Sequence, residues 1–243
     1  MKNNQGNVFF LILIAVALFA MVSYSLSSGG PVKSDLSDEE AELAISDMIQ
    51  YHTRIKQVVR DLRMLKECAD TEISFHYDSD GDGILETDGQ DDYYNPNAPA
   101  DFSCHVFDVR GGGLSYKAPD IKLLDPAYAT APFAQETVFA TSRLGGSADP
   151  TMGTAESDLV IFVGYATERI CNLYTERLGH HDYIAEDNDL TLAAPYFVGA
   201  YPSYGDMDQG PTRTQDKLFG GCVQGRAPFS EPSYVLYHLL IER

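Results

Sequence analysis

An unbroken apolar run near the N-terminus, Val8–Val22, limits most strongly what this chain can fold into. With the four residues that follow, the segment reaches Leu26. At about 1.5 Å per residue, a helix of this length spans about 28 Å, close to the hydrocarbon thickness of a bilayer. No charged residue lies between Lys2 and Lys33. The run therefore predicts a transmembrane helix with a cytoplasmic N-terminus and an extracytoplasmic head, because positively charged flanks stay inside.

A cleaved secretory signal is the alternative interpretation of the same run. Its small-residue cleavage site would lie near Ser25-Leu26-Ser27. The apolar part of such signals has about 7–15 residues, so this run lies at or beyond the upper limit and its retention is favoured. Mass spectrometry of the mature N-terminus separates the alternatives, since a start at Ser28 indicates a secretory signal.

A short polar leader ends in Gly6 and is followed at once by the apolar stretch Asn7–Ile12. This arrangement resembles the class III signal of type IV pilins and pseudopilins. The resemblance implies cleavage after Gly6, which makes Asn7 the mature N-terminus, and an apolar helix that packs into a filament core. The chain departs from the pattern at Leu11, the fifth mature residue, where most pilins have Glu.

The resemblance implies an α+β, pilin-like fold. A long N-terminal apolar helix would continue into an amphipathic helix packed on a mainly antiparallel β-sheet head. The chain then divides into a leader (1–6), a transmembrane or filament-core helix (7–30), an amphipathic helix (34–67) and a globular, disulfide-containing head (68–243).

The amphipathic helix is also indicated by its own residues. Ser37 fits an N-cap, and Glu40, three residues later, completes a capping box. Spacings of four and three residues then predict an apolar stripe along a helix of about 28 residues, in heptad register. This stripe would face the sheet of the head or neighbouring subunits. Its members are Ala44, Met48, Tyr51, Ile55, Val58, Leu62 and Leu65.

Charge excludes one class of partner. The chain has 36 acidic and 17 basic residues, a net charge of −19, and the first 33 residues contain no acid. A head this negative repels phosphate backbones, so we expect no nucleic-acid binding. It attracts cations, although solubility alone is an alternative explanation of the charge.

Four dispersed cysteines, without a CxxC pair, indicate disulfides rather than zinc ligands. Three pairings are possible. We favour Cys68–Cys104 and Cys171–Cys222, the pairs nearest in sequence. Each would stabilise the fold by roughly 3–4 kcal/mol in the chain-entropy model. Four reduced, buried thiols are the alternative for a cytosolic head.

An acidic segment, 78–89, begins with the D-x-D-x-D-G pattern of a calcium loop. Alternate carboxylates converge on one point, and hard oxygen ligands suit Ca²⁺. Gly89 stands where an EF-hand has a bidentate Glu. A solvated acidic turn is the alternative. The candidate ligands are Asp78, Asp80, Asp82, the carbonyl of Ile84, Glu86 and Asp88.

The rest of the head is assigned by local pattern. Alternation predicts strands at 71–77, 104–109 and 234–242, and 159–163 is a buried apolar run. Residues 166–178 predict a helix that stops at Gly179. Composition favours irregular loops over 118–157.

We find no sequence motif of an enzyme. We therefore expect a structural subunit of a pilus-like or pseudopilus-like extracellular filament, with calcium and disulfides stabilising its head. Its partners would be its own copies or other pilins, the inner membrane before assembly, and a surface ligand. A non-polymerising, membrane-anchored binding protein or adhesin is the alternative.

Overall fold

The computed structural model describes residues 37–78, 85, 93–128, 136–144, 156–180, 185–187, 196–202, 206–207, 219–225 and 233–243. Its helices are α2 (Asp38–Leu65) and α3 (Glu168–Arg177), with short 3-10 turns η1 (Asp70–Glu72), η2 (Ile121–Leu123) and η3 (Pro126–Tyr128). Its strands are β1 (Val138–Leu144), β2 (Asp158–Ala166), β3 (Ala185–Asp187), β4 (Asp206–Met207), β5 (Gly220–Gly225) and β6 (Ser233–Ile241).

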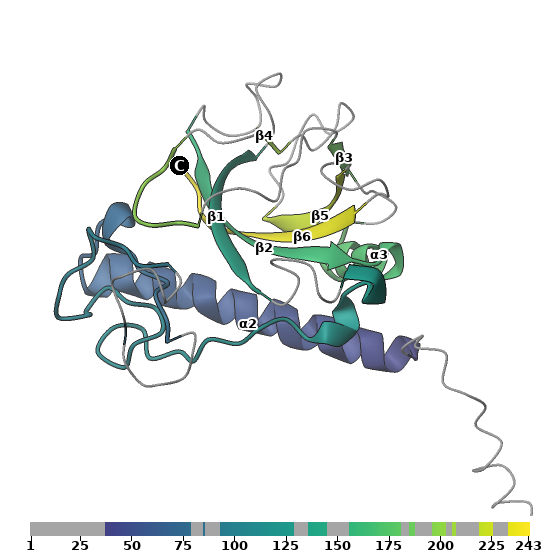
Figure 1. Ribbon diagram of the computed structural model, residues 1–243, viewed down its shortest axis with the longest axis horizontal. Helices are drawn as coiled ribbons and strands as arrows, with labels where there is room; N and C mark the ends of the chain where they lie inside the picture. The colour runs from purple at the N-terminus through teal and green to yellow at the C-terminus, as the bar shows by residue number, and fades with distance from the viewer. Residues whose placement is uncertain are drawn as a thin grey trace, which may run out of the picture. The chain divides into compact units, whose positions relative to one another are not determined.

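Helix α2 runs along one side of a curved sheet (Figure 1). It has 28 residues, the length predicted, and acidic residues fill its first turn, where they oppose the positive end of the helix dipole. The helix ends where the backbone N–H groups of Lys66 and Cys68 both donate to the carbonyl of Leu62, each at 3.2 Å. Glu67 takes a positive φ of 57°, as in a left-handed C-terminal cap.

The apolar stripe of α2 is offset from the prediction. Met48, Ile55 and Leu62 are buried as expected, but Leu65 is 78% exposed. The buried line has the predicted spacings of four and three, shifted onto neighbouring positions. It includes a histidine that is not part of the predicted apolar stripe. The buried residues of the helix are Ala41, Ile45, Met48, His52, Ile55, Val59 and Leu62.

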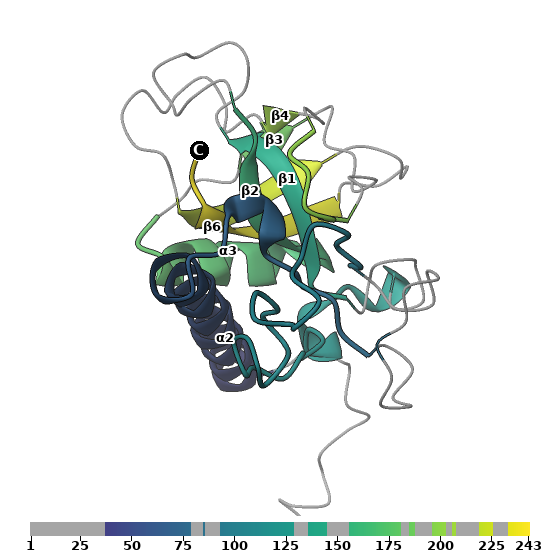
Figure 2. The same ribbon diagram turned by 90° about the vertical axis from the view of Figure 1, so that its left-hand side faces the viewer.

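The sheet has the order β3-β5-β6-β2-β1-β4. Its four central strands pair antiparallel, while β3 and β4 pair parallel with β5 and β1. Helix α3 lies beside α2, and the view turned by 90° shows both on the same side of the sheet (Figure 2). Every residue of β2 is buried, so this strand has the apolar character of a central strand covered on both faces.

The core between α2 and the sheet is rich in aromatic rings. Ile55, Val59 and Leu62 of the helix join Phe139 of β1 and Ile161 of β2. The ring of Phe75, which is fully buried, stacks on that of Phe139 with 4.1 Å between centroids. The described residues 66–78 and 93–128, which we call the wrapping segment, contribute further side chains to this core and close it from the side.

Several local predictions are confirmed. The apolar run 159–163 lies in β2, 234–242 forms most of β6, and 166–178 contains α3. Thr167 caps α3 by accepting from the backbone N–H of Ile170, and Gly179 has a φ of +83°. A C-terminal glycine takes this conformation without a Cβ penalty.

Other local predictions are wrong. The segments 71–77 and 104–109 form turns joined by a single isolated bridge, Ser74–His105, rather than strands. Both residues of that bridge are buried, because the wrapping segment is enclosed on both sides. Strand β1 lies inside the region assigned to irregular loops, where its polar Thr141 and Ser142 are also buried.

The predicted fold class needs correction. The antiparallel sheet and its amphipathic helix are present, but no long N-terminal apolar helix running into that helix is found among the described residues. Ser37 is not helical, and α2 begins at Asp38. The predicted helix at 7–30 and the leader at 1–6 lie outside the described residues.

The predicted inner-membrane localisation is also corrected. In the part of the chain that the structure describes, neither helix is both long and apolar enough to span a bilayer. Ten of the 28 residues of α2 are charged, and α3 has only 10 residues. A spanning helix needs about 20 mainly apolar residues, which neither provides.

Candidate functional site

Two disulfides fasten the covering elements to the head. Cys68–Cys104 joins the residues just after α2 to the wrapping segment, and Cys171–Cys222 joins α3 to β5. This is the predicted pairing, and the chain has no free cysteine. The bridges attach the end of α2 and helix α3 to the rest of the head. Disulfide bonds of this kind are typical of a protein from an oxidising compartment.

Helix α2 is strongly polarised by charge. Between residues 38 and 47 it carries five acidic and no basic side chains, while residues 54–66 carry five basic side chains and one acid. On a chain with a net charge of −19, this basic segment is exceptional. The two ends lie about 40 Å apart, because a helix rises about 1.5 Å per residue.

The basic end also exposes large apolar side chains. Met64 and Leu65 of α2 are 70% and 78% exposed, and Val109 is 89% exposed. The loop of Val109 lies at the same end, because the ammonium of Lys66 donates to the carbonyls of Arg110 and Gly111. We call Met64, Leu65 and Val109 the end patch.

Cations surround the end patch. Arg60 and Arg63 lie four and one residues before Met64, so Arg60 shares its face of the helix. Arg60 is exposed and makes no ion pair with another described residue, whereas Arg63 pairs with Asp70 at 2.5 Å. The guanidinium of Arg110 lies 3.8 Å from the ring centre of Phe102. Apolar and cationic groups therefore share this surface.

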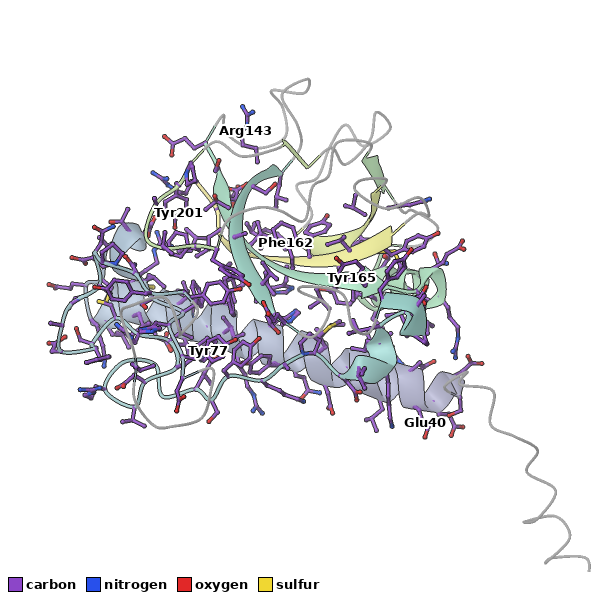
Figure 3. All side chains as sticks on the ribbon, in the orientation of Figure 1. Glu40, Tyr77, Arg143, Phe162, Tyr165 and Tyr201 are labelled. Carbon is purple, nitrogen blue, oxygen red and sulfur yellow. A yellow bond between two sulfur atoms is a disulfide. The ribbon has the colours of Figure 1, made fainter. Side chains whose placement is uncertain are left out.

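The acidic end of α2 borders a groove. This groove, of about 540 Å³, lies between the first turns of α2 and α3. Arg169 and Arg177 of α3 bridge to Asp38 and Glu42 of α2. Figure 3 shows the neighbouring Glu40 pointing outward at this end of the helix. We call the surface the acidic groove; its lining residues are Asp38, Glu42, Glu168, Arg169, Asn172 and Leu173.

The inner face of α2 carries a buried histidine pair. The rings of His52 in α2 and His238 in β6 lie 5.9 Å apart, and the two residues are 2% and 7% exposed. Among the described residues, neither Nδ1 has a hydrogen-bond partner. Burial, with the neighbouring His238, lowers the pKa of His52 to about 3. Burial, with the charge of Lys56, lowers the pKa of His238 to about 4.

The candidate calcium ligands Asp80, Asp82, Ile84, Glu86 and Asp88 lie outside the described residues. Asp78 borders a hollow of about 500 Å³, together with Asp108 and Glu136. Both of these carboxylates have protein partners: Asp108 binds Arg110 at 2.8 Å, and Glu136 accepts from the hydroxyl of Tyr196 at 2.8 Å. Among the described residues, no group of three His, Cys, Asp or Glu is suited to a metal ion.

Calcium binding at 78–88 stays a prediction, and melting tests it. We expect the full chain to melt at a higher temperature in millimolar calcium than in EGTA, because an ion that binds only the folded state stabilises it. Substituting Asp80 and Asp82 with Asn should remove the difference, since both carboxylates would be lost. Magnesium at equal concentration controls for ionic strength. Equal melting temperatures in calcium and EGTA would contradict the prediction.

The predicted processing residues Gly6 and Asn7 also lie outside the described residues. Sequence reasoning missed both the end patch and the histidine pair. The charge polarity of α2 could have been read from the order of its residues, whereas nothing in the sequence pairs His52 with His238. Comparison with protein-family models, curated proteins and solved structures gave no match.

Proposed function

We propose that this chain is a structural subunit of an extracellular filament, built from copies of itself outside the reducing cytoplasm. The observation that carries the proposal is the end patch, where three large apolar side chains are left in water at one end of a long helix. Exposed apolar side chains gathered in one place mark protein–protein contacts. The two disulfides support an oxidising location, where such bridges persist.

The filament form rests on the first residues of the chain. The leader that ends in Gly6 resembles that of type IV pilins, whose subunits polymerise through an apolar segment. The run Val8–Val22 needs burial, and a bundle of equivalent segments supplies it. A binding protein or adhesin that does not polymerise is the competing function, and it would use the end patch for a different partner.

Polar substitutions in the end patch test the proposal. We expect Met64→Gln, Leu65→Gln and Val109→Thr together to weaken self-association by at least about tenfold, because apolar anchors each contribute roughly 1 kcal/mol or more to an interface. Electron microscopy of material sheared from cells should show fibres for the native chain and none for the variant. Sedimentation velocity of the purified full chain should show the same loss.

The control is Ile121→Gln, which removes an apolar side chain that is 55% exposed and lies outside the end patch. The control should assemble like the native chain. A native chain that stays monomeric at every concentration and yields no fibres would overturn the proposal. So would a triple variant that assembles as well as the native chain.

A further inference from the structure

We infer that the heads assemble head to tail, with the basic end of one copy docked in the acidic groove of the next. This inference rests on the proposed function and names the partner surface of the end patch. The partner is a second copy of this chain, and the contact lies between the two opposite ends of α2.

Charge complementarity identifies the occupant of the acidic groove. The groove is lined by the carboxylates of Asp38, Glu42 and Glu168, of which the first two pair with arginines of α3, and the exposed Glu39 follows Asp38 on the helix. An acidic surface selects a cationic partner. Five of the 17 basic residues of the chain lie between residues 54 and 66, at the far end of the same helix.

The two ends of α2 cannot neutralise each other within one molecule. They are separated by most of α2, which is about 40 Å long at about 1.5 Å per residue. The helix is fastened to the head by its buried side chains and by Cys68–Cys104, so its ends cannot approach each other. A basic end that meets the acidic groove therefore belongs to another molecule.

The groove also offers an apolar wall. Leu173 of α3 lines it, while Arg169 and Arg177 are held against α2 by Asp38 and Glu42. A partner with cations around an apolar centre matches this arrangement. The basic end has that form, with Arg60 and Arg63 next to Met64 and Leu65.

Contact between unlike ends has a geometric consequence. Two copies joined in this way keep one free acidic end and one free basic end between them. Such a heterologous contact propagates into a ring or a filament, whereas a symmetric dimer would consume both surfaces at once. The arrangement therefore leads to a polymer rather than a closed pair.

Two charge-reversed variants of the full chain test this inference. The first, Glu39→Lys with Glu42→Lys, reverses two charges at the acidic end of α2. The second, Arg60→Glu with Arg63→Glu, reverses two charges at the basic end. Each alone should associate at least about tenfold more weakly than the native chain, because most of the charge complementarity between the two ends is lost at every contact. An equimolar mixture should recover assembly, since the two variants can alternate along the polymer.

The control is Lys122→Glu, which reverses an exposed charge that lines neither the acidic groove nor the end patch and should assemble normally. Sedimentation velocity at low salt and electron microscopy give the readouts, and circular dichroism checks that each variant is folded. Recovery in the mixture supports head-to-tail docking. If native fibres form but the single variants assemble equally well, or the mixture fails to recover, the docking is overturned while the filament function stands. Absence of native fibres overturns both.

Discussion

Lowering the pH from 7 to 5 is expected to reduce the free energy of unfolding by about 4 kcal/mol through His52 and His238. Both have a folded-state pKa, about 3 and about 4, below the ordinary value of 6.5. The unfolded chain therefore binds more protons than the folded one between these values. The stabilising contribution is complete above pH 6.5 and is lost as the pH falls toward 4. Each histidine contributes about 2 kcal/mol of that loss by pH 5.

Geometry explains why a proton is costly there. The two rings lie tilted against each other between α2 and β6, and the ammonium of Lys56 adds a charge of the same sign as a protonated His238 beside that ring. Burial lowers the pKa of Lys56, and the charge of Glu242 opposes that shift. Protonation would place like charges in the core and push α2 away from β6.

Urea denaturation of the full chain at pH 7 and pH 5 measures the effect. The double variant His52→Gln, His238→Gln should be less stable at pH 7 but should lose about 4 kcal/mol less on acidification. His180→Gln, a substitution of a partly exposed histidine just after α3, controls for the loss of any imidazole. An unchanged difference between the two pH values in the double variant would contradict the assignment.

Removing the Cys171–Cys222 bridge is expected to lower the free energy of unfolding by about 4 kcal/mol, because it closes a loop of 51 residues. A loss of this size is a large fraction of the total stability of a typical domain, about 5–15 kcal/mol. The bridge is the covalent link between α3 and β5, and α3 forms one wall of the acidic groove. Its loss should therefore loosen the proposed docking surface as well.

Chemical denaturation of Cys171→Ala with Cys222→Ala measures the loss, and hydrogen exchange locates it. Amides of α3 should exchange faster in this variant. The matched control, Cys68→Ala with Cys104→Ala, removes a bridge with a separation of 36 residues and should increase exchange near the end of α2 instead. Equal free energies of unfolding for the oxidised native chain and for Cys171→Ala with Cys222→Ala would show that the bridge does not stabilise the fold.

The charges of the two ends of α2 follow from the order of residues along the helix, so the sequence determines them once the helix is accepted. The length of α2 and the apolar centre of β2 were equally local. Each depends on side chains three or four residues apart, or on a continuous apolar run. The disulfide pairing was also predicted, because the nearest cysteines in sequence were the ones brought together.

The tertiary structure decided what local patterns cannot express. The buried line of α2 shifted by one position toward His52 and Val59, because the sheet and the wrapping segment select which side of the helix they cover. The strand predicted from the alternation at 71–77 was wrong for a similar reason. Alternation indicates a strand with one buried and one exposed face, whereas this segment is buried on both sides. Met64 and Leu65 remained in water although the heptad pattern placed Leu65 in the apolar stripe.

Contacts between residues distant in sequence account for these differences. His52 and His238 are 186 positions apart. Only the docking of α2 on β6 buries both rings and so lowers the pKa of each. The acidic groove likewise needs α3 beside α2. Residue order determined the helix, its charges and its disulfide partners, whereas long-range packing decided which side of the helix is buried and which surfaces are left for another molecule.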